Sequence, residues 1–226
     1  MKITEHDGVN LKYLIVEPDD DKTEEDRPLI FLLHGFGADM RDLTGLCERI
    51  SARKYIYVCP NAPLPFQIGP DLTGYGWTPP FGEANEKDFE WAAKLLEEFF
   101  CEVLTRYPKL SRKWLLLGFS QGGSMVYKCG LLRPDLFSGL VMLSSSIRNP
   151  EQIKPQLPIS RTQSIFIAHG LFDRLAPVGL SRNANTFLKH EGYNTEYYEY
   201  EIGHEISGQI ICDLVPWING VLHPMT

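Results

Sequence analysis

Five short runs of mostly apolar residues, separated by segments with a helical pattern, limit the folds open to this chain of 226 residues. The runs cover residues 29–33, 55–59, 114–117, 140–143 and 164–168. Each is apolar at both odd and even positions, which is typical of strands buried on both faces of a parallel sheet. Two further strands are expected at residues 11–16 and 195–201, and the second alternates more strongly.

Helical patterns fall between these runs. We expect helices at residues 89–107, 121–132, 178–190 and 207–221. Pro216 lies inside the last segment, which argues against one straight helix there. The alternation of strands and helices predicts an α/β fold in which helices cover both faces of a mostly parallel central sheet. The length suits a single domain over residues 1–226.

Residues 63–82 show neither the pattern of a strand nor that of a helix and are predicted to form a long loop. The segment contains five prolines and four glycines, together with the aromatic residues Phe66, Tyr75, Trp77 and Phe81. A loop of this length inside a compact domain is usually functional or disordered. Its aromatic content argues against disorder, because disordered segments are poor in aromatic residues.

Composition excludes several classes of partner. The net charge is −7 and no Lys/Arg-rich run occurs, so we expect no nucleic-acid partner. No apolar run reaches membrane-spanning length, and the first residues lack the apolar stretch of a signal peptide. Five scattered cysteines have neither metal nor disulfide spacing, which favours free thiols in the cytoplasm. The oligomeric state is not indicated.

The most informative motif is Gly118-Phe119-Ser120-Gln121-Gly122, directly after the apolar run 114–117. A G-x-S-x-G pentapeptide between a strand and a helix is the nucleophile elbow. Its serine occupies a strained backbone position that exposes the hydroxyl group above the sheet. The context therefore predicts that Ser120 is a nucleophile.

A serine hydroxyl needs a base, usually a histidine oriented by a carboxylate. Asp173 follows the strand expected at 164–168, and His204 follows the strand expected at 195–201. This order of serine, acid and histidine is typical of enzymes with a nucleophile elbow. We predict Asp173 as the acid and His204 as the base, and we assign His34 and His169 structural hydrogen-bonding roles.

Attack on a carbonyl also creates an oxyanion, which preorganised N–H groups stabilise. One donor comes from the residue after the nucleophile, here Gln121. The other comes from the loop after an early strand, and His34-Gly35-Phe36-Gly37 follows the run 29–33. An ordinary glycine turn is the alternative, but beside the elbow we favour an oxyanion loop with the Phe36 N–H as donor.

With these motifs the chain resembles the phospholipase/carboxylesterase family of α/β-hydrolases, which includes acyl-protein thioesterases and small bacterial carboxylesterases. The matching stretches are His34–Asp39, Pro60–Pro63, Leu117–Gly123, His169–Asp173 and Gly203–Ile206. The resemblance implies an α/β-hydrolase fold, a triad of Ser120, Asp173 and His204, and oxyanion roles for Phe36 and Gln121. It also implies that no metal or organic cofactor is needed.

Two family elements that shape the acyl pocket differ here. Trp77 is followed by Thr78 and Pro79, where relatives usually carry an aromatic residue and Asp. After the predicted acid, this chain has Leu175-Ala176-Pro177 where relatives have Leu-Val-Pro. The aromatic loop indicates a site for an apolar acyl or aryl group. Its predicted substrate-binding residues are Phe66, Tyr75, Trp77 and Leu175. Core packing is an equal alternative for Phe66 and Tyr75, whereas the family position favours the pocket for Trp77.

These residues predict a serine carboxylesterase that hydrolyses small to medium carboxylic esters through an acyl-enzyme, with a small-molecule ester as its partner. An acyl-protein thioesterase or a lysophospholipase with the same triad is the first alternative. A non-catalytic binding protein with the hydrolase fold is the second.

Overall fold

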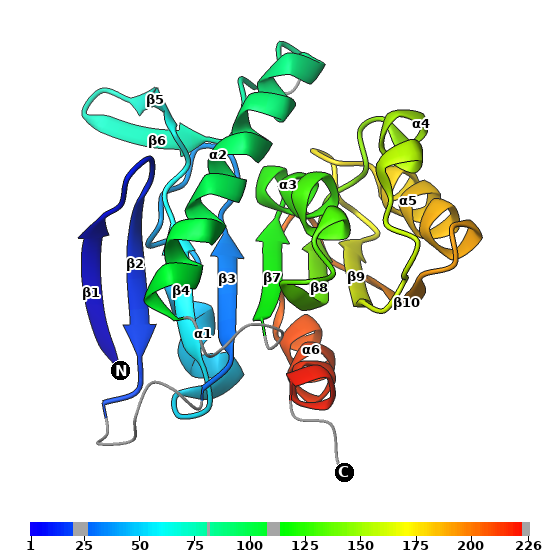
Figure 1. Ribbon diagram of the computed structural model, residues 1–226. Helices are drawn as coiled ribbons and strands as arrows, with labels where there is room; N and C mark the ends of the chain where they lie inside the picture. Colours follow the sequence, from blue (N-terminus) through cyan, green and yellow to red (C-terminus); the bar gives the residue numbers. More distant parts are fainter. Residues whose placement is uncertain (20–26, 81, 108–113, 223–226) are drawn as a thin grey trace.

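The structure is a computed structural model that describes residues 1–19, 27–80, 82–107 and 114–222 (Figure 1). Its strands are β1 (Lys2–Asp7), β2 (Lys12–Glu17), β3 (Leu29–Leu33), β4 (Ile56–Pro60), β5 (Leu64–Gly69), β6 (Leu72–Gly76), β7 (Trp114–Phe119), β8 (Phe137–Leu143), β9 (Ser164–Gly170) and β10 (Asn194–Tyr200). Its α-helices are α1 (Thr44–Ser51), α2 (Glu86–Arg106), α3 (Gln121–Cys129), α4 (Pro150–Ile153), α5 (Val178–His190) and α6 (Gly208–Leu222).

Eight strands form the central sheet in the order β1-β2-β4-β3-β7-β8-β9-β10. From β4 to β10 every neighbouring pair is parallel, whereas β2 is antiparallel to both β1 and β4. The predicted α/β fold with a mostly parallel sheet is therefore confirmed. Parallel neighbours end at the same edge of the sheet, so the loops that follow β3, β7, β9 and β10 can meet there.

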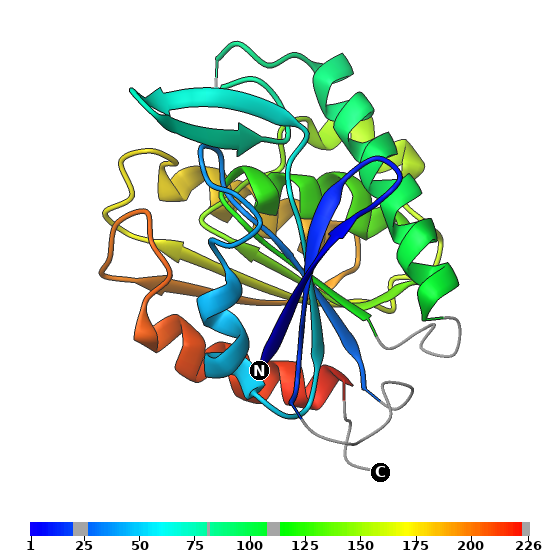
Figure 2. The ribbon, with the colours of Figure 1, turned by 90° about the vertical axis from the view of Figure 1, so that its left-hand side faces the viewer.

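Helices cover both faces of the sheet (Figure 2). α2, α3 and α5 contribute to one buried apolar cluster, and α1 and α6 contribute to the other. β3 shows why its sequence is apolar throughout: Leu29, Phe31 and Leu33 enter the first cluster, whereas Ile30 and Leu32 enter the second. The period of two in a strand thus sends successive side chains into opposite cores.

The predicted loop at residues 63–82 is wrong in part, because β5 and β6 form an antiparallel hairpin there. The two strands are largely exposed or half-buried and contain prolines and glycines, so they lack the apolar pattern of a buried strand. The hairpin lies over the edge at which the parallel strands end (Figure 1). Residue 81, also in that predicted loop, is outside the described residues.

The other predicted elements agree with the structure to within a few residues, apart from two details. The predicted helix at 121–132 ends as α3 at Cys129 and continues as a 3₁₀ turn, Gly130–Leu132. α6 is one helix that includes Pro216. None of the helices described in the structure is long and apolar enough to span a membrane.

Candidate active site

The four chain segments that carry the predicted catalytic groups leave the sheet at one edge (Figure 1). Ser120 follows β7, and the 34–37 loop follows β3. Asp173 lies three residues after β9, and His204 lies four residues after β10. Parallel pairing of β3 with β7, of β8 with β7 and β9, and of β9 with β10 aligns these ends. The topology therefore brings together residues up to 84 positions apart, as for Ser120 and His204.

Ser120 sits at a tight turn between β7 and α3. Its φ of 55° and ψ of −119° lie in a region that non-glycine residues rarely adopt. Its N–H donates to the Leu143 carbonyl of β8 at 2.9 Å, which anchors the turn to the sheet. Gly122 permits the close packing, because a Cβ there would lie 2.2 Å from the Leu33 carbonyl oxygen. This is the strained geometry that the G-x-S-x-G motif predicts.

Ser120, His204 and Asp173 form a continuous chain of hydrogen bonds. His204 Nδ1 lies 2.6 Å from Asp173 Oδ2, and His204 Nε2 lies 2.8 Å from Ser120 Oγ. A carboxylate only accepts, so Nδ1–H is the donor and Nε2 of the neutral ring can accept the serine proton. The Asp173 side chain is fully buried, and that of His204 is 14% exposed. The Phe119 ring packs against the imidazole with a centroid separation of 4.9 Å.

The Asp173 carboxylate is held by its own loop. Its Oδ1 accepts the N–H groups of Leu175 and Ala176 at 2.9 and 2.8 Å. Burial opposes ionisation, but the bonds from Ala176, His204 and Leu175 outweigh it and lower the pKa of Asp173. The carboxylate is therefore ionised at neutral pH and can stabilise a cationic His204.

His169 supports the same loop from β9. Its ring is fully buried, and Nε2 lies 2.7 Å from the Ala176 carbonyl and 3.3 Å from Asp173 Oδ2. Both partners accept, so Nε2 carries the proton. His169 thus joins the strand to both ends of the turn that presents Asp173, in the structural hydrogen-bonding role predicted for it.

The two predicted oxyanion donors lie on chain segments beside the serine. A Cβ built on Gly35 would lie 3.4 Å from Ser120 Cβ, so the loop with Phe36 packs directly on Ser120. The Phe36 N–H donates no hydrogen bond to any residue that the structure describes. Gln121 is the first residue of α3, where N–H groups have no partner inside the helix. Both predicted oxyanion donors thus lie on segments next to Ser120.

The predicted substrate-binding residues lie in three different environments. The half-buried Phe66 ring contacts the ring of Phe36 at 4.8 Å, and Phe36 is 38% exposed. Leu175 is 77% exposed on the Asp173 loop. Tyr75 packs against the first core cluster, and Trp77 has no exposed surface. The structure thus places Phe66 and Leu175 where a ligand could reach them and buries Trp77; their substrate roles stay predictions.

His34 and the Gln121 side chain make contacts that the motifs alone did not reveal. His34 Nε2 accepts the Ala62 N–H at 3.0 Å, so Nδ1–H donates to the Gly35 carbonyl at 2.8 Å. Burial lowers the pKa of His34, which keeps the ring neutral. Gln121 bonds to the segment after β6. In the sequence, the position of Gln121 next to Ser120 indicates a role for its main-chain N–H. Nothing in the sequence indicates the bonds that its side chain makes.

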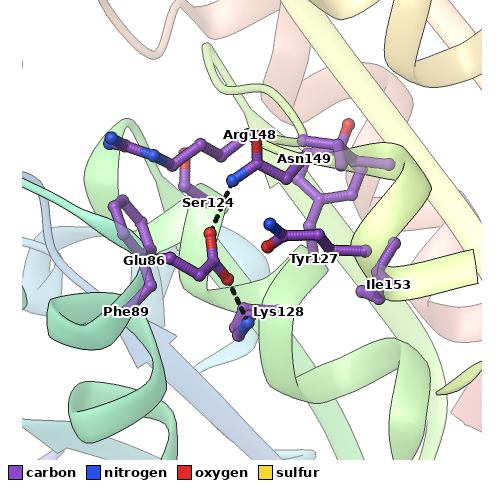
Figure 3. A pocket seen from close by; sticks show the side chains of 10 residues that line it. Glu86, Phe89, Ser124, Tyr127, Lys128, Arg148, Asn149 and Ile153 are labelled. Carbon is purple, nitrogen blue, oxygen red and sulfur yellow. Dashed lines mark hydrogen bonds and ion pairs between the residues drawn. The ribbon is translucent and has the colours of Figure 1, made fainter.

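A hollow beside α3 is lined by charged and polar side chains that bond to one another or to the main chain (Figure 3). Glu86 at the start of α2 pairs with Lys128 of α3 at 2.6 Å and accepts the Asn149 amide at 2.5 Å. Arg148 lies over the Phe89 ring at 4.9 Å and donates to the Ala84 carbonyl. The bonds between these side chains join α2 and the segment after β8 to α3, the helix that begins beside Ser120.

Comparisons with known proteins identify relatives of this chain. A family model described as phospholipase/carboxylesterase matches residues 13–222. A probable carboxylesterase from Oryza sativa subsp. japonica is 31% identical over 112 residues, which cover 46% of this chain and 40% of that protein. Acyl-protein thioesterase 1 from Mycosarcoma maydis is 24% identical, covering 85% of this chain and 90% of that protein.

A solved structure extends the agreement to the fold. The crystal structure of esterase PE8 superposes with a TM-score of 0.83 at 26% identity and covers 95% of this chain and 100% of that chain. The family model, the relatives and the arrangement around Ser120 lead to the same conclusion. The chain belongs to the phospholipase/carboxylesterase family of α/β-hydrolases and is an ester-cleaving serine hydrolase.

Proposed function

We propose that Ser120, His204 and Asp173 hydrolyse small to medium carboxylic esters through an acyl-enzyme. The observation that carries this proposal is the unbroken chain of bonds from Asp173 through His204 to Ser120 Oγ. His204 Nε2 takes the Ser120 proton as the serine oxygen attacks the ester carbonyl. The ionised Asp173 then stabilises the imidazolium that forms.

The tetrahedral intermediate places its negative charge on the former carbonyl oxygen. The N–H groups of Phe36 and Gln121 bind this oxyanion, since both belong to segments packed next to Ser120. The imidazolium gives its proton to the leaving alcohol, which departs and leaves the acyl group on Ser120. Water then repeats the sequence, with His204 as base, and releases the acid.

The acyl group lies between the Phe36–Phe66 ring pair and the Asp173 loop in this proposal. Phe36 and Leu175 are exposed apolar residues on the loops that carry the oxyanion and acid groups. An apolar surface with a few placed polar groups suits an ester with an apolar acyl chain. The described cysteines are free, which supports a reducing cytoplasmic location.

A substrate panel tests the proposal. Aryl esters of increasing acyl length, alcohol esters, an S-acyl-cysteine peptide and a lysophospholipid are compared by kcat/KM. We expect the highest values for short and medium carboxylic esters. A clear preference for the long-chain thioester would instead support the acyl-protein thioesterase alternative, which the Mycosarcoma maydis relative favours. An intact protein that turns over no ester would support the non-catalytic alternative.

A further inference from the structure

The segment formed by residues 74–79, at the end of β6 and just after it, lies against both chain segments that supply the proposed oxyanion donors. Gly37 N–H donates to the Tyr75 carbonyl and Tyr75 N–H donates to the Ala38 carbonyl, each at 2.8 Å. Gly74 allows this approach, because a Cβ there would lie 2.0 Å from the Gly37 carbonyl oxygen. The segment thus pairs directly with the loop that carries Phe36.

The same segment holds the side chain of Gln121. Gln121 Oε1 accepts the Trp77 main-chain N–H at 2.7 Å. Gln121 Nε2 donates to the Thr78 carbonyl at 3.0 Å and to Thr78 Oγ1 at 2.9 Å. These bonds satisfy both ends of the amide and direct it toward the 74–79 segment. The main-chain N–H of Gln121 remains the group proposed to face the substrate.

Trp77 bonds to both sides. Its main-chain N–H reaches Gln121, and its indole Nε1–H donates to the His34 carbonyl at 2.9 Å, two residues before Phe36. The indole has no exposed surface and lies 5.5 Å from the His34 ring. A buried ring whose polar groups are hydrogen-bonded is suited to fixing the distance between the two segments that it bonds to. It offers no surface to an acyl chain.

We propose that Trp77 is a positioning residue that sets the separation between the N–H groups of Phe36 and Gln121. This inference rests on the proposed function. An oxyanion hole stabilises charge only when its donors lie about 2.7–3.1 Å from the oxyanion position, so a small shift between the two segments weakens catalysis without weakening substrate binding. The role replaces the acyl contact predicted for Trp77 and explains why its ring lies inside the protein.

The test compares Trp77→Phe with Trp114→Phe. Trp114 is also fully buried, but its indole nitrogen has no hydrogen-bond partner among the described residues. The two changes therefore remove similar volume, and only the first removes a hydrogen bond. We expect Trp77→Phe to lower kcat for an aryl ester about tenfold with KM within about twofold, because a shifted Phe36 N–H weakens one hydrogen bond to the oxyanion.

A transition-state analogue separates positioning from general damage. A trifluoromethyl ketone forms an adduct with a serine that carries an oxyanion, so Trp77→Phe should weaken its inhibition by a factor similar to the loss in kcat. Trp114→Phe should leave kcat and inhibition within about twofold, with melting temperatures recorded for both. Should Trp77→Phe fail to fold, Gln121→Met tests the other bond of Trp77, because it keeps the main-chain N–H of Gln121 and removes the amide that accepts the Trp77 N–H; we expect the same pattern.

Two results would overturn the inference. One is a kcat for Trp77→Phe no lower than for Trp114→Phe. The other is a changed KM and acyl-length preference at unchanged kcat, which would restore direct substrate contact. Wild-type protein that neither cleaves aryl esters nor reacts with a fluorophosphonate would remove the proposed function itself, and that result is distinct from a silent Trp77→Phe in an active enzyme.

Discussion

The two sides of Ser120 are built differently. On the proposed acid–base side, the side chains of His204 and Asp173 carry the roles, and His204 is bonded to Asp173 at 2.6 Å and to Ser120 at 2.8 Å. On the oxyanion side, the proposed donors of Phe36 and Gln121 are main-chain groups, and the residues that hold them come from the β5–β6 hairpin and the segment after it. The first side depends on residue identity, whereas the second depends on backbone position. Substitutions on the two sides should therefore impair ester hydrolysis in different ways.

The largest effect is expected from Ser120→Ala. Removal of the nucleophile should lower kcat by roughly a million-fold if the triad acts as a unit. Steady-state hydrolysis of an aryl ester measures it, with Ser124→Ala, one turn along α3, as the control. Near-full activity in Ser120→Ala would refute the assignment of the nucleophile.

Asp173→Asn should come next, with a loss in kcat of roughly ten thousand-fold. An amide can present an N–H to His204 Nδ1, which favours the tautomer whose Nε2 cannot accept the serine proton. Asp213→Asn is the matched control, since Asp213 lies on α6 and accepts a bond from Tyr200 at 2.7 Å, outside the bonds that join Asp173, His204 and Ser120. Equal rates for the two variants would contradict the role of Asp173.

Residue identity also explains what could be predicted before the structure. Apolar runs indicate the buried strands, and Ser120, Asp173 and His204 each stand in a short motif just after an expected strand, so the triad could be predicted although its members lie up to 84 positions apart. β1 was missed because its residues are exposed or half-buried and follow no apolar pattern. The contacts of Trp77 were missed because its partners Gln121 and His34 lie 44 and 43 positions away. Composition shows an aromatic residue but not the bonds that it makes.

Phe66→Ala should change acyl selectivity, with a smaller effect than the two triad substitutions have on kcat. The Phe66 ring centroid lies 4.8 Å from that of Phe36, so truncation removes an apolar contact and opens space beside the proposed oxyanion loop. We expect the ratio of kcat/KM for long over short acyl esters to change by about tenfold or less, while kcat on the shortest ester stays the same. Leu72→Ala, an exposed apolar residue of the same hairpin, is the control. An unchanged chain-length profile would remove Phe66 from the acyl site.

The smallest effect should be one of stability alone. Glu86→Gln weakens the pair with Lys128 in a partly exposed hollow, so the free energy of unfolding should fall by roughly 0.5–1 kcal/mol. Burial raises the pKa of Glu86, but the bonds from Lys128 and Asn149 have the larger effect, so the pKa lies below the ordinary value of 4.5. This stabilisation is complete above pH 4.5 and is lost as the pH falls through the lowered pKa.

Urea unfolding at pH 7 and below pH 4 measures that dependence, with the exposed Glu90→Gln of the same helix as control. The difference between wild type and Glu86→Gln should shrink at the lower pH, and kcat should remain unchanged. A difference that grows as the pH falls would contradict the sign of the pKa shift.

The most direct test of the account is covalent labelling at neutral pH. Wild-type protein is treated with a fluorophosphonate, digested and analysed by peptide mass spectrometry, while loss of aryl-ester hydrolysis is followed in the same sample. We predict one modified peptide carrying the label on Ser120, with activity lost in proportion to labelling. Full hydrolytic activity after complete labelling of Ser120, or inactivation with the label on another residue, would contradict it.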